Sequence, residues 1–195
     1  MRRLFGVSLI VFCAGLFIGC TQKVEMQVDP VAHGKYLVNL GGCNDCHTPK
    51  VMGANNEPLP DTTRLLSGHV ADEPYPTWSP ADMQRSAIAL TNPSLSAWAG
   101  PWGVSFAINL TPDVETGVGE WTEEAFIASM RTGKHQGQPN GRPILPPMPW
   151  QSLAKVTDGD LKAMWAYMRS IPPVKNQVPL PVPPGAPPMG AEQAQ

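Results

Sequence analysis

The chain of 195 residues carries 14 Lys and Arg against 16 Asp and Glu, a formal net charge of −2, and only 15% of its residues are charged. This weakly acidic balance provides no basic patch for a nucleic acid partner, and the length fits one domain. The 23 prolines predict long stretches of extended or irregular backbone.

The N-terminus has the pattern of an export signal. Met1-Arg2-Arg3 precedes an apolar run from Leu4 to Gly19, which is short for a membrane span. The end of this run, 16–20, resembles the lipobox of bacterial lipoproteins, although Phe17 stands where that family usually has leucine. The resemblance implies a signal peptide over residues 1–19, lipidation of Cys20, and export to the periplasmic side of a bacterial membrane. Cleavage elsewhere by the ordinary signal peptidase, or an uncleaved anchor, are the alternatives.

Residues 20–28 are then the lipidated cysteine and a short tether. Asp29 and Pro30 have the pattern of a helix N-cap and first helical position. We expect the helix to present an apolar side made by Tyr36, Leu37 and Leu40, and to end at Gly41 and Gly42.

The pentapeptide Cys43-Asn44-Asp45-Cys46-His47 follows immediately. Two thiols at this spacing, followed by a histidine, form the attachment signature of one covalent c-type haem, with His47 as an axial iron ligand. A thioredoxin-like redox pair would require a strand and a βαβ context, which the sequence does not show. A structural zinc site would require a second Cys/His pair. No cysteine follows Cys46 to supply one. Removal of residues 1–19 takes away Cys13, and because lipid would take Cys20 and haem the other two cysteines, we expect no disulfide.

Between Thr48 and Leu110 the sequence lacks helical periodicity. The segment 79–82 could start one short helix, and 102–110 has the apolar content of a strand or extended segment. About 60 residues are too many for an idle loop in a compact domain. We therefore expect this irregular insertion to wrap the haem and cover its edge, while His33 and His69 lie at the surface.

Two helices are predicted in the second half. Thr122 caps the first, Phe126, Ile127 and Met130 face inward, and Gly133 ends it. A loop rich in Pro and Gly spans 134–150. Thr157 starts the last helix, which Pro172 and Pro173 end. Its buried stripe is formed by Leu161, Met164, Trp165 and Met168. The proline-rich tail that follows is expected to build no core and to lie on the surface as polyproline II or hang free.

Met148 is the expected sixth ligand of the iron. Prolines on both sides fix its backbone, so the weakly binding thioether is presented from a preset loop. Met130, Met164 and Met168 are better explained as core residues. His135, which lies in the same loop, and an open coordination site remain the alternatives.

The helix ending in Gly-Gly-Cys-x-x-Cys-His, the late methionine loop and the final aromatic-bearing helix resemble class I c-type cytochromes. More narrowly, the segments 107–113, 119–122, 131–133 and 147–149 resemble the cytochrome subunits of membrane-linked alcohol and gluconate dehydrogenases. The resemblance covers residues 30–175 and implies a mainly α fold, with three or more helices around one haem. Subunits of that group generally carry three haem motifs, whereas this chain has one.

The resemblance also implies particular residue roles. Gly34 and Tyr36 should meet Trp165 or Tyr167 where the first and last helices cross. The predicted haem-edge residues are Asn109, Thr111, Arg142 and Trp150. The carbonyl of Pro49 is the expected partner of the second imidazole nitrogen of His47.

The domains expected are a cytochrome c domain over 29–175 and a proline-rich tail over 176–195. The function expected is electron transfer, as a membrane-tethered periplasmic carrier or as a cytochrome subunit of a dehydrogenase or respiratory chain. The partners would be redox proteins, such as a dehydrogenase or a terminal oxidase, and the chain itself would not be an enzyme. A haem redox enzyme or a haem-based sensor is the alternative, and both need an exchangeable sixth ligand.

Overall fold

The computed structural model describes residues 28–79, 81–82 and 88–186. The predicted signal peptide, Cys20, nearly all of the tether and residues 187–195 lie outside the described residues. None of the described helices has the length and apolar composition needed to cross a membrane.

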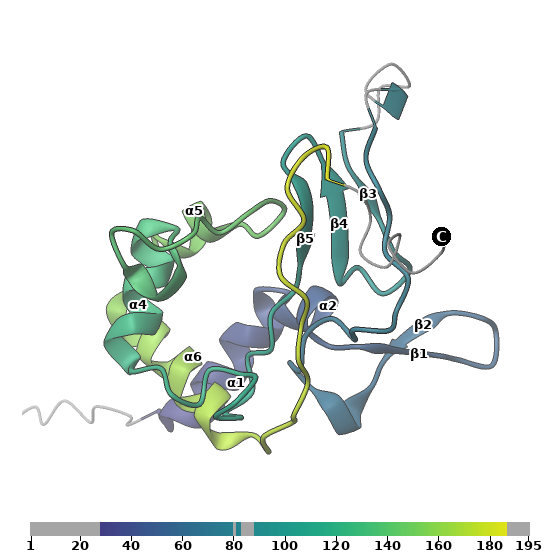
Figure 1. The fold of residues 1–195 in the computed structure, drawn as a ribbon. Helices are drawn as coiled ribbons and strands as arrows, with labels where there is room; N and C mark the ends of the chain where they lie inside the picture. Colours follow the sequence, from purple (N-terminus) through teal and green to yellow (C-terminus); the bar gives the residue numbers. More distant parts are fainter. Residues whose placement is uncertain (1–27, 80, 83–87, 187–195) are drawn as a thin grey trace, which may run out of the picture.

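The described part is rich in helix and contains a few short strands (Figure 1). Its α-helices are α1 (Pro30–Leu40), α2 (Cys43–His47), α4 (Glu123–Thr132), α5 (Trp150–Leu153) and α6 (Asp158–Ser170). The 3-10 helices are η1 (Thr62–Arg64) and η2 (His135–Gly137). The strands are β1 (Lys50–Met52), β2 (Pro58–Pro60), β3 (Leu90–Thr91), β4 (Ala97–Gly100) and β5 (Gly103–Phe106). The described part is therefore mixed but helix-rich, which supports the predicted mainly α fold only in this coarser form.

The predicted helix boundaries are confirmed by their caps. The carboxylate of Asp29 accepts a hydrogen bond from the amide of Val31, with Pro30 in the first turn of α1. The hydroxyls of Thr122 and Thr157 accept from the third amide of α4 and α6, respectively. Gly133 ends α4 with a φ of +66°, a left-handed conformation that favours glycine.

Helices α1 and α6 cross against each other (Figure 1). A Cβ at Gly34 would lie 1.8 Å from the carbonyl oxygen of Ala163 and 2.9 Å from the Cβ of Tyr167, so only glycine permits this approach. The prediction that Gly34 meets α6 near Tyr167 is confirmed.

The predicted apolar face of α1 is wrong for two residues. Tyr36 is 59% exposed and Leu40 69% exposed, whereas Gly34 and Val38 are buried. Tyr36 stacks on His33, with ring centroids 6.5 Å apart. The reason is geometric: Tyr36 is two residues from Gly34 and points about 200° away around the helix. Because the Gly34 side of α1 lies against α6, the side that carries Tyr36 faces solvent.

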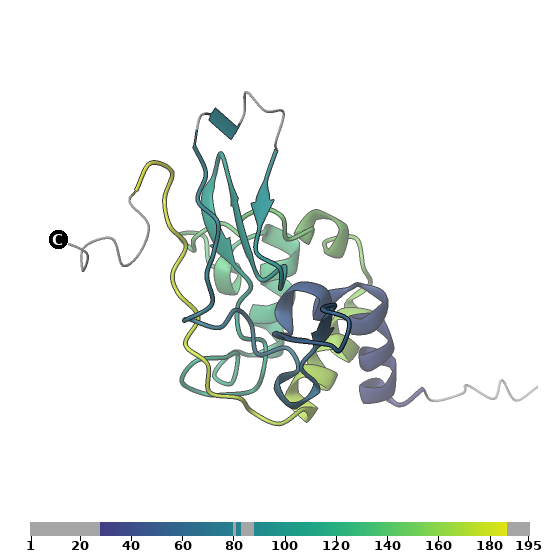
Figure 2. The ribbon, with the colours of Figure 1, turned by 90° about the vertical axis from the view of Figure 1, so that its right-hand side faces the viewer.

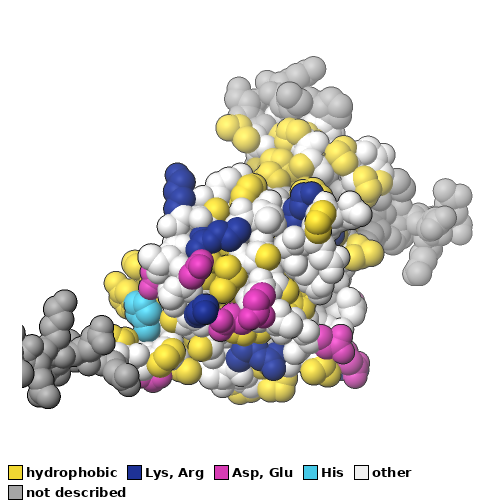
Figure 3. All heavy atoms as spheres, turned by 90° about the vertical axis from the view of Figure 1, so that its left-hand side faces the viewer, with side chains coloured by type: hydrophobic (Ala, Val, Ile, Leu, Met, Phe, Trp, Pro, Cys, Tyr) yellow, Lys and Arg dark blue, Asp and Glu magenta, His cyan; other side chains and the backbone are white. Residues whose placement is uncertain are grey.

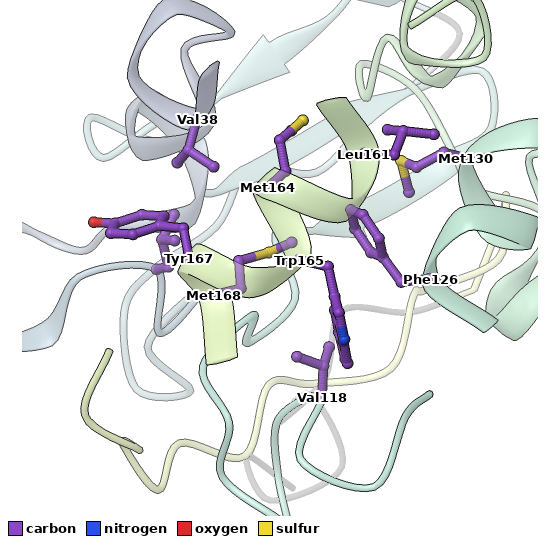
Figure 4. Packing of buried hydrophobic residues seen from close by; sticks show 10 residues of the cluster. Val38, Val118, Phe126, Met130, Leu161, Met164, Trp165, Tyr167 and Met168 are labelled. Atoms are coloured by element: carbon purple, nitrogen blue, oxygen red, sulfur yellow. The ribbon is translucent and has the colours of Figure 1, made fainter. Parts of the chain in front are cut away.

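The main core gathers on α6 (Figure 4). Leu161, Met164, Trp165 and Met168 are all buried, which confirms the predicted stripe. Trp165 stacks on Phe126 of α4, with ring centroids 5.5 Å apart. The other buried members of the cluster are Val38, Leu66, Val118, Met130 and Tyr167.

The insertion forms two small antiparallel sheets. Strand β1 pairs with β2, with Val51 opposite Leu59, and β4 lies between β3 and β5. Strand β5 falls within the predicted extended segment 102–110, which confirms it. Ala81 and Asp82 are helical, and Asp82 accepts hydrogen bonds from the backbone amide and hydroxyl of Ser79. The rest of that predicted helix lies outside the described residues.

The prediction that the proline-rich tail builds no core is wrong for residues 174–182. This segment runs beside β5 (Figures 1 and 2). Val182 forms an antiparallel bridge with Val104 through two backbone hydrogen bonds of 2.8 and 2.9 Å. Val182 and Val178 pack with Ala97, Ala99, Val104 and Phe106 in a second apolar cluster. The non-proline residues of the tail retain amides and apolar side chains, and these dock on the sheet.

His69 is also placed differently from its prediction. Its side chain is fully buried, with Nδ1 2.8 Å from the Ser96 hydroxyl and its ring 4.9 Å from that of Phe106.

On the face that exposes α4 and α6, basic, acidic and apolar side chains are interspersed (Figure 3). This face therefore carries no field of a single sign.

We predict that Gly34→Ala lowers the free energy of unfolding by about 1–3 kcal/mol, because the new methyl group must push α1 and α6 apart. Denaturant unfolding of the haem-loaded protein measures this. Gly159→Ala is the matched control. A Cβ at Gly159 has only the Thr157 hydroxyl within 4 Å, at 3.8 Å, so the control should be neutral or stabilise by about 0.4–1 kcal/mol. Equal effects of the two substitutions would contradict the close helix crossing.

Candidate cofactor site

A partly open cavity with mainly apolar walls is lined by residues of the main core. Its walls include α1, α2, α4 and α6, the segment that follows β5, and the segment that leads into α5 (Figure 1). Core residues that line it are Val38, Leu66, Phe126, Met130, Met164 and Met168. These side chains therefore face a common space as well as each other. An apolar group of matching size would complete the core.

Helix α2 places both cysteines of the haem motif on this cavity. Cys43 and Cys46 are three residues apart, which puts them on one face of the helix, and both are free thiols that line the cavity. Burial raises the pKa of the Cys43 thiol to about 11 and also raises the pKa of Cys46. A redox-active pair needs a lowered thiol pKa. The thioredoxin-like alternative is therefore disfavoured.

His47 is buried at the end of α2 and lines the same cavity. Its Nδ1 lies 2.8 Å from the carbonyl oxygen of Ile108, which can only accept, so Nδ1 carries the proton. Burial lowers the pKa of His47 and keeps the imidazole neutral. The lone pair is then on Nε2, in the state that binds a metal.

The predicted partner of this imidazole, the carbonyl of Pro49, is wrong. Thr48 is already extended (φ −110°, ψ 123°) and leads into β1. The carbonyl of Pro49 consequently accepts from the amide of Asp61 at 2.8 Å, beyond the end of the β1–β2 pairing. Ile108, 61 residues after His47, takes its place. No residue-type signal marks it, because the group that acts is a backbone carbonyl.

Met148 lines the cavity from the segment that leads into α5, together with Pro147 and Pro149. Its side chain packs against the main core cluster. The hydroxyl of Ser105 donates to the carbonyl of Pro146 and ties this segment to β5. Residues of this segment and of α2 line the same cavity. The structure thus brings Met148 and the haem motif, about 100 residues apart, to one space.

His135 and Arg142 also line the cavity. The His135 ring lies edge-on against Trp121, with centroids 5.0 Å apart, and its amide donates to the carbonyl of Arg142. Burial, with a further contribution from the Arg142 charge, lowers the pKa of His135. Burial also lowers the pKa of Arg142, although a guanidinium stays charged at neutral pH. The cavity wall therefore carries one cation.

Of the four predicted haem-edge residues, Arg142 alone lines the cavity. Asn109 and Thr111 do not line the cavity, and both are buried in a shared hydrogen-bond network. The side-chain oxygen Oδ1 of Asn109 accepts from the backbone amide and the hydroxyl of Thr111, and its side-chain nitrogen Nδ2 donates to the backbone carbonyl of Val174 at 2.8 Å. Trp150 lies over Gly133, where an added Cβ would come within 2.4 Å of its ring.

The sequence did not single out Trp98, which lines the cavity from β4. Its indole nitrogen donates to the carbonyl of Leu95 at 2.6 Å. No local pattern marks this residue, because the insertion that carries it lacks periodicity.

The residues present fit a covalently attached haem better than a metal held by side chains alone. The described residues contain no group of three or more His, Cys, Asp or Glu side chains able to hold a metal ion, so the zinc alternative lacks a ligand set. Two thiols, one neutral imidazole and one thioether instead line an apolar cavity, which is the donor set of a c-type haem site.

No family model matches the chain. It is 33% identical over 175 residues to the cytochrome c subunit of the quinone alcohol dehydrogenase of Gluconacetobacter polyoxogenes, an alignment covering 89% of the chain and 28% of that subunit. It is 28% identical over 145 residues to the gluconate 2-dehydrogenase cytochrome c subunit of Pantoea cypripedii, covering 74% of the chain and 24% of the subunit. A nicotinate dehydrogenase subunit of Pseudomonas putida is 38% identical over 79 residues, 40% of the chain and 6% of that protein.

The chain spans less than a third of the length of these relatives. Relatives that align over most of the chain are cytochrome c subunits of dehydrogenases, in agreement with the resemblance of segments 107–113 and 147–149. The homologues therefore support a dehydrogenase-associated cytochrome with haem c and a role in electron transfer.

We predict that Asn109→Ala lowers the free energy of unfolding by about 1–3 kcal/mol, because it leaves the buried Thr111 amide without its acceptor and removes the shorter of the two side-chain hydrogen bonds to the Val174 carbonyl. Denaturant unfolding measures this loss. Asn55→Ala, at an exposed position, should change it by less than about 0.5 kcal/mol. Unchanged stability of Asn109→Ala together with an altered visible spectrum would indicate a haem contact instead.

Proposed function

We propose that the chain binds one haem c through Cys43 and Cys46, with His47 and Met148 as axial ligands, and that it transfers electrons. The observation that supports this most strongly is the convergence of all four side chains on one apolar cavity. When bound, the haem supplies a one-electron couple between ferric and ferrous iron. Residues of the chain would attach the haem, supply its axial ligands and exclude water from it.

Those residues have separable tasks. The thiols of Cys43 and Cys46 would form the thioethers that prevent loss of the cofactor. His47, neutral and oriented by Ile108, would supply the proximal nitrogen. Met148, between Pro147 and Pro149, would supply the sulfur that raises the reduction potential above that of a bis-histidine site. The apolar walls would exclude water and favour the less charged ferrous state.

The setting proposed is a membrane-tethered carrier, or a cytochrome subunit, on the periplasmic side of a bacterial membrane. The apolar run 4–19 and Cys20 support export and lipidation. The named relatives support a dehydrogenase as the electron donor. A lipid anchor would confine encounters with such partners to the membrane surface.

A haem redox enzyme is the second candidate, and one observation favours it. His135 and Arg142 line the same cavity, so acid–base groups are available there. If Met148 binds the iron, its thioether fills the position that a peroxide or other substrate would need. The two functions therefore differ in whether Met148 stays bound.

Intact mass spectrometry of the mature protein tests attachment. We expect a chain that begins at an acylated Cys20 and carries one haem. Cys43→Ala/Cys46→Ala should lose the covalent haem, whereas Met52→Ala, at a 58% exposed position, should retain it. A free Thr21 or an intact Met1 at the N-terminus would refute lipidation alone, and an unmodified mass of the wild-type chain would refute covalent haem.

The sulfur-to-iron charge-transfer band of the ferric protein tests the sixth ligand. We expect Met148→Ala to abolish this band and to lower the reduction potential, because a water or His135 would replace the thioether. Met52→Ala is the matched control and should keep the band. A Met148→Ala spectrum identical to that of the wild type would refute the assignment.

A further inference from the structure

Two backbone segments lie behind His47. The inner strap is defined as residues 107–110, and it contains the carbonyl of Ile108 that accepts the Nδ1 proton. The outer strap is defined as residues 66–69, and its Gly68 amide donates to the carbonyl of His47 at 2.7 Å. The two straps thus hold both the ring and the backbone carbonyl of His47.

The outer strap fixes the position of the inner strap. The amide of His69 donates to the carbonyl of Ala107 at 2.9 Å, and the amide of Leu110 donates to the carbonyl of Leu66 at 2.8 Å. These two bonds bracket Ile108. At Gly68, which has a φ of +82°, an added Cβ would lie 2.7 Å from the carbonyl carbon of Ile108. The Ile108 carbonyl therefore has little freedom while the outer strap stays in place.

Asn176, from the docked tail, holds the outer strap. Its side-chain amide donates to the carbonyls of Ser67 and His69, each at 2.8 Å, on either side of Gly68. Its backbone amide donates to the hydroxyl of Thr116 at 3.0 Å, and the residue is only 8% exposed. One amide group thus satisfies two buried carbonyls, and its removal would leave both without partners.

We propose that Asn176 is a positioning residue for the proximal ligand: through the two straps it holds the Ile108 carbonyl on His47 and so lowers the reduction potential. This inference rests on the proposed function. A carbonyl that accepts the Nδ1 proton makes the imidazole a more basic ligand. A more basic ligand stabilises ferric iron, the more charged state. Loosening the straps weakens that effect and raises the potential.

A purely structural role of Asn176 predicts the opposite sign. Pro181, five residues further along the tail, lines the cavity. If the loss of Asn176 merely detached the tail, water would reach the cavity and stabilise the ferric state. The potential would then fall, so the direction of the shift separates the two roles.

The test is the reduction potential of the haem-loaded protein with Asn176→Ala and Asn176→Ser. We expect Asn176→Ala to shift the ferric–ferrous equilibrium about three- to tenfold toward the ferrous form, a tenfold change being 59 mV upward for a one-electron couple. Asn176→Ser retains one donor and should shift it less. Gln177→Ala, its exposed neighbour, should leave the potential unchanged. In the ferrous state, NMR should show faster exchange of the His47 Nδ1 proton in Asn176→Ala.

An unchanged or lowered potential in Asn176→Ala, with the wild-type charge-transfer band intact, would overturn the inference. If that variant retains no haem, Asn176→Ser decides: a raised potential supports the proposal and a lowered or unchanged one overturns it. A wild-type protein without the charge-transfer band would refute the proposed ligation instead, so the two failures are distinguishable.

Discussion

The structure depends on a partly open apolar cavity that residues of its main core line. In a filled core, side chains such as Phe126, Met130 and Met164 would pack only against one another, but here they also line a shared space. Apolar walls that are left exposed to water cost stability roughly in proportion to their area. A covalent apolar cofactor would remove that cost and add its own contacts, so binding and folding would be coupled.

The cavity also explains the chemical state of the residues around it. Burial keeps the imidazole of His47 neutral and disfavours thiolates at Cys43 and Cys46. A site built for thiolate chemistry would need nearby positive charge on the sulfur atoms. This one instead provides an oriented neutral nitrogen and a thioether in apolar surroundings, which suits an iron that changes charge without exchanging ligands.

The sequence allowed α4, α6 and the haem motif to be predicted, because their signals are local. Thr122 and Thr157 cap their helices, and the stripe from Leu161 to Met168 repeats at the helical period. The Ile108 carbonyl and the docking of Asn176 could not be predicted. The Ile108 carbonyl lies 61 residues from His47, and Asn176 lies 107 residues from His69. Both contacts are made through backbone carbonyls, which residue identity does not encode. The exposed face of α1 was mistaken because a backbone approach at Gly34, and not the count of apolar side chains, decides which side is buried.

Carbon monoxide binding to the ferrous protein tests most directly whether this is a closed, six-coordinate electron carrier. With the Met148 thioether bound between its prolines, binding should be slow and weak, and Met148→Ala should make it rapid. Rapid, tight binding to the wild-type protein would show an exchangeable sixth position. That result would contradict the electron-carrier proposal and favour a haem enzyme or sensor.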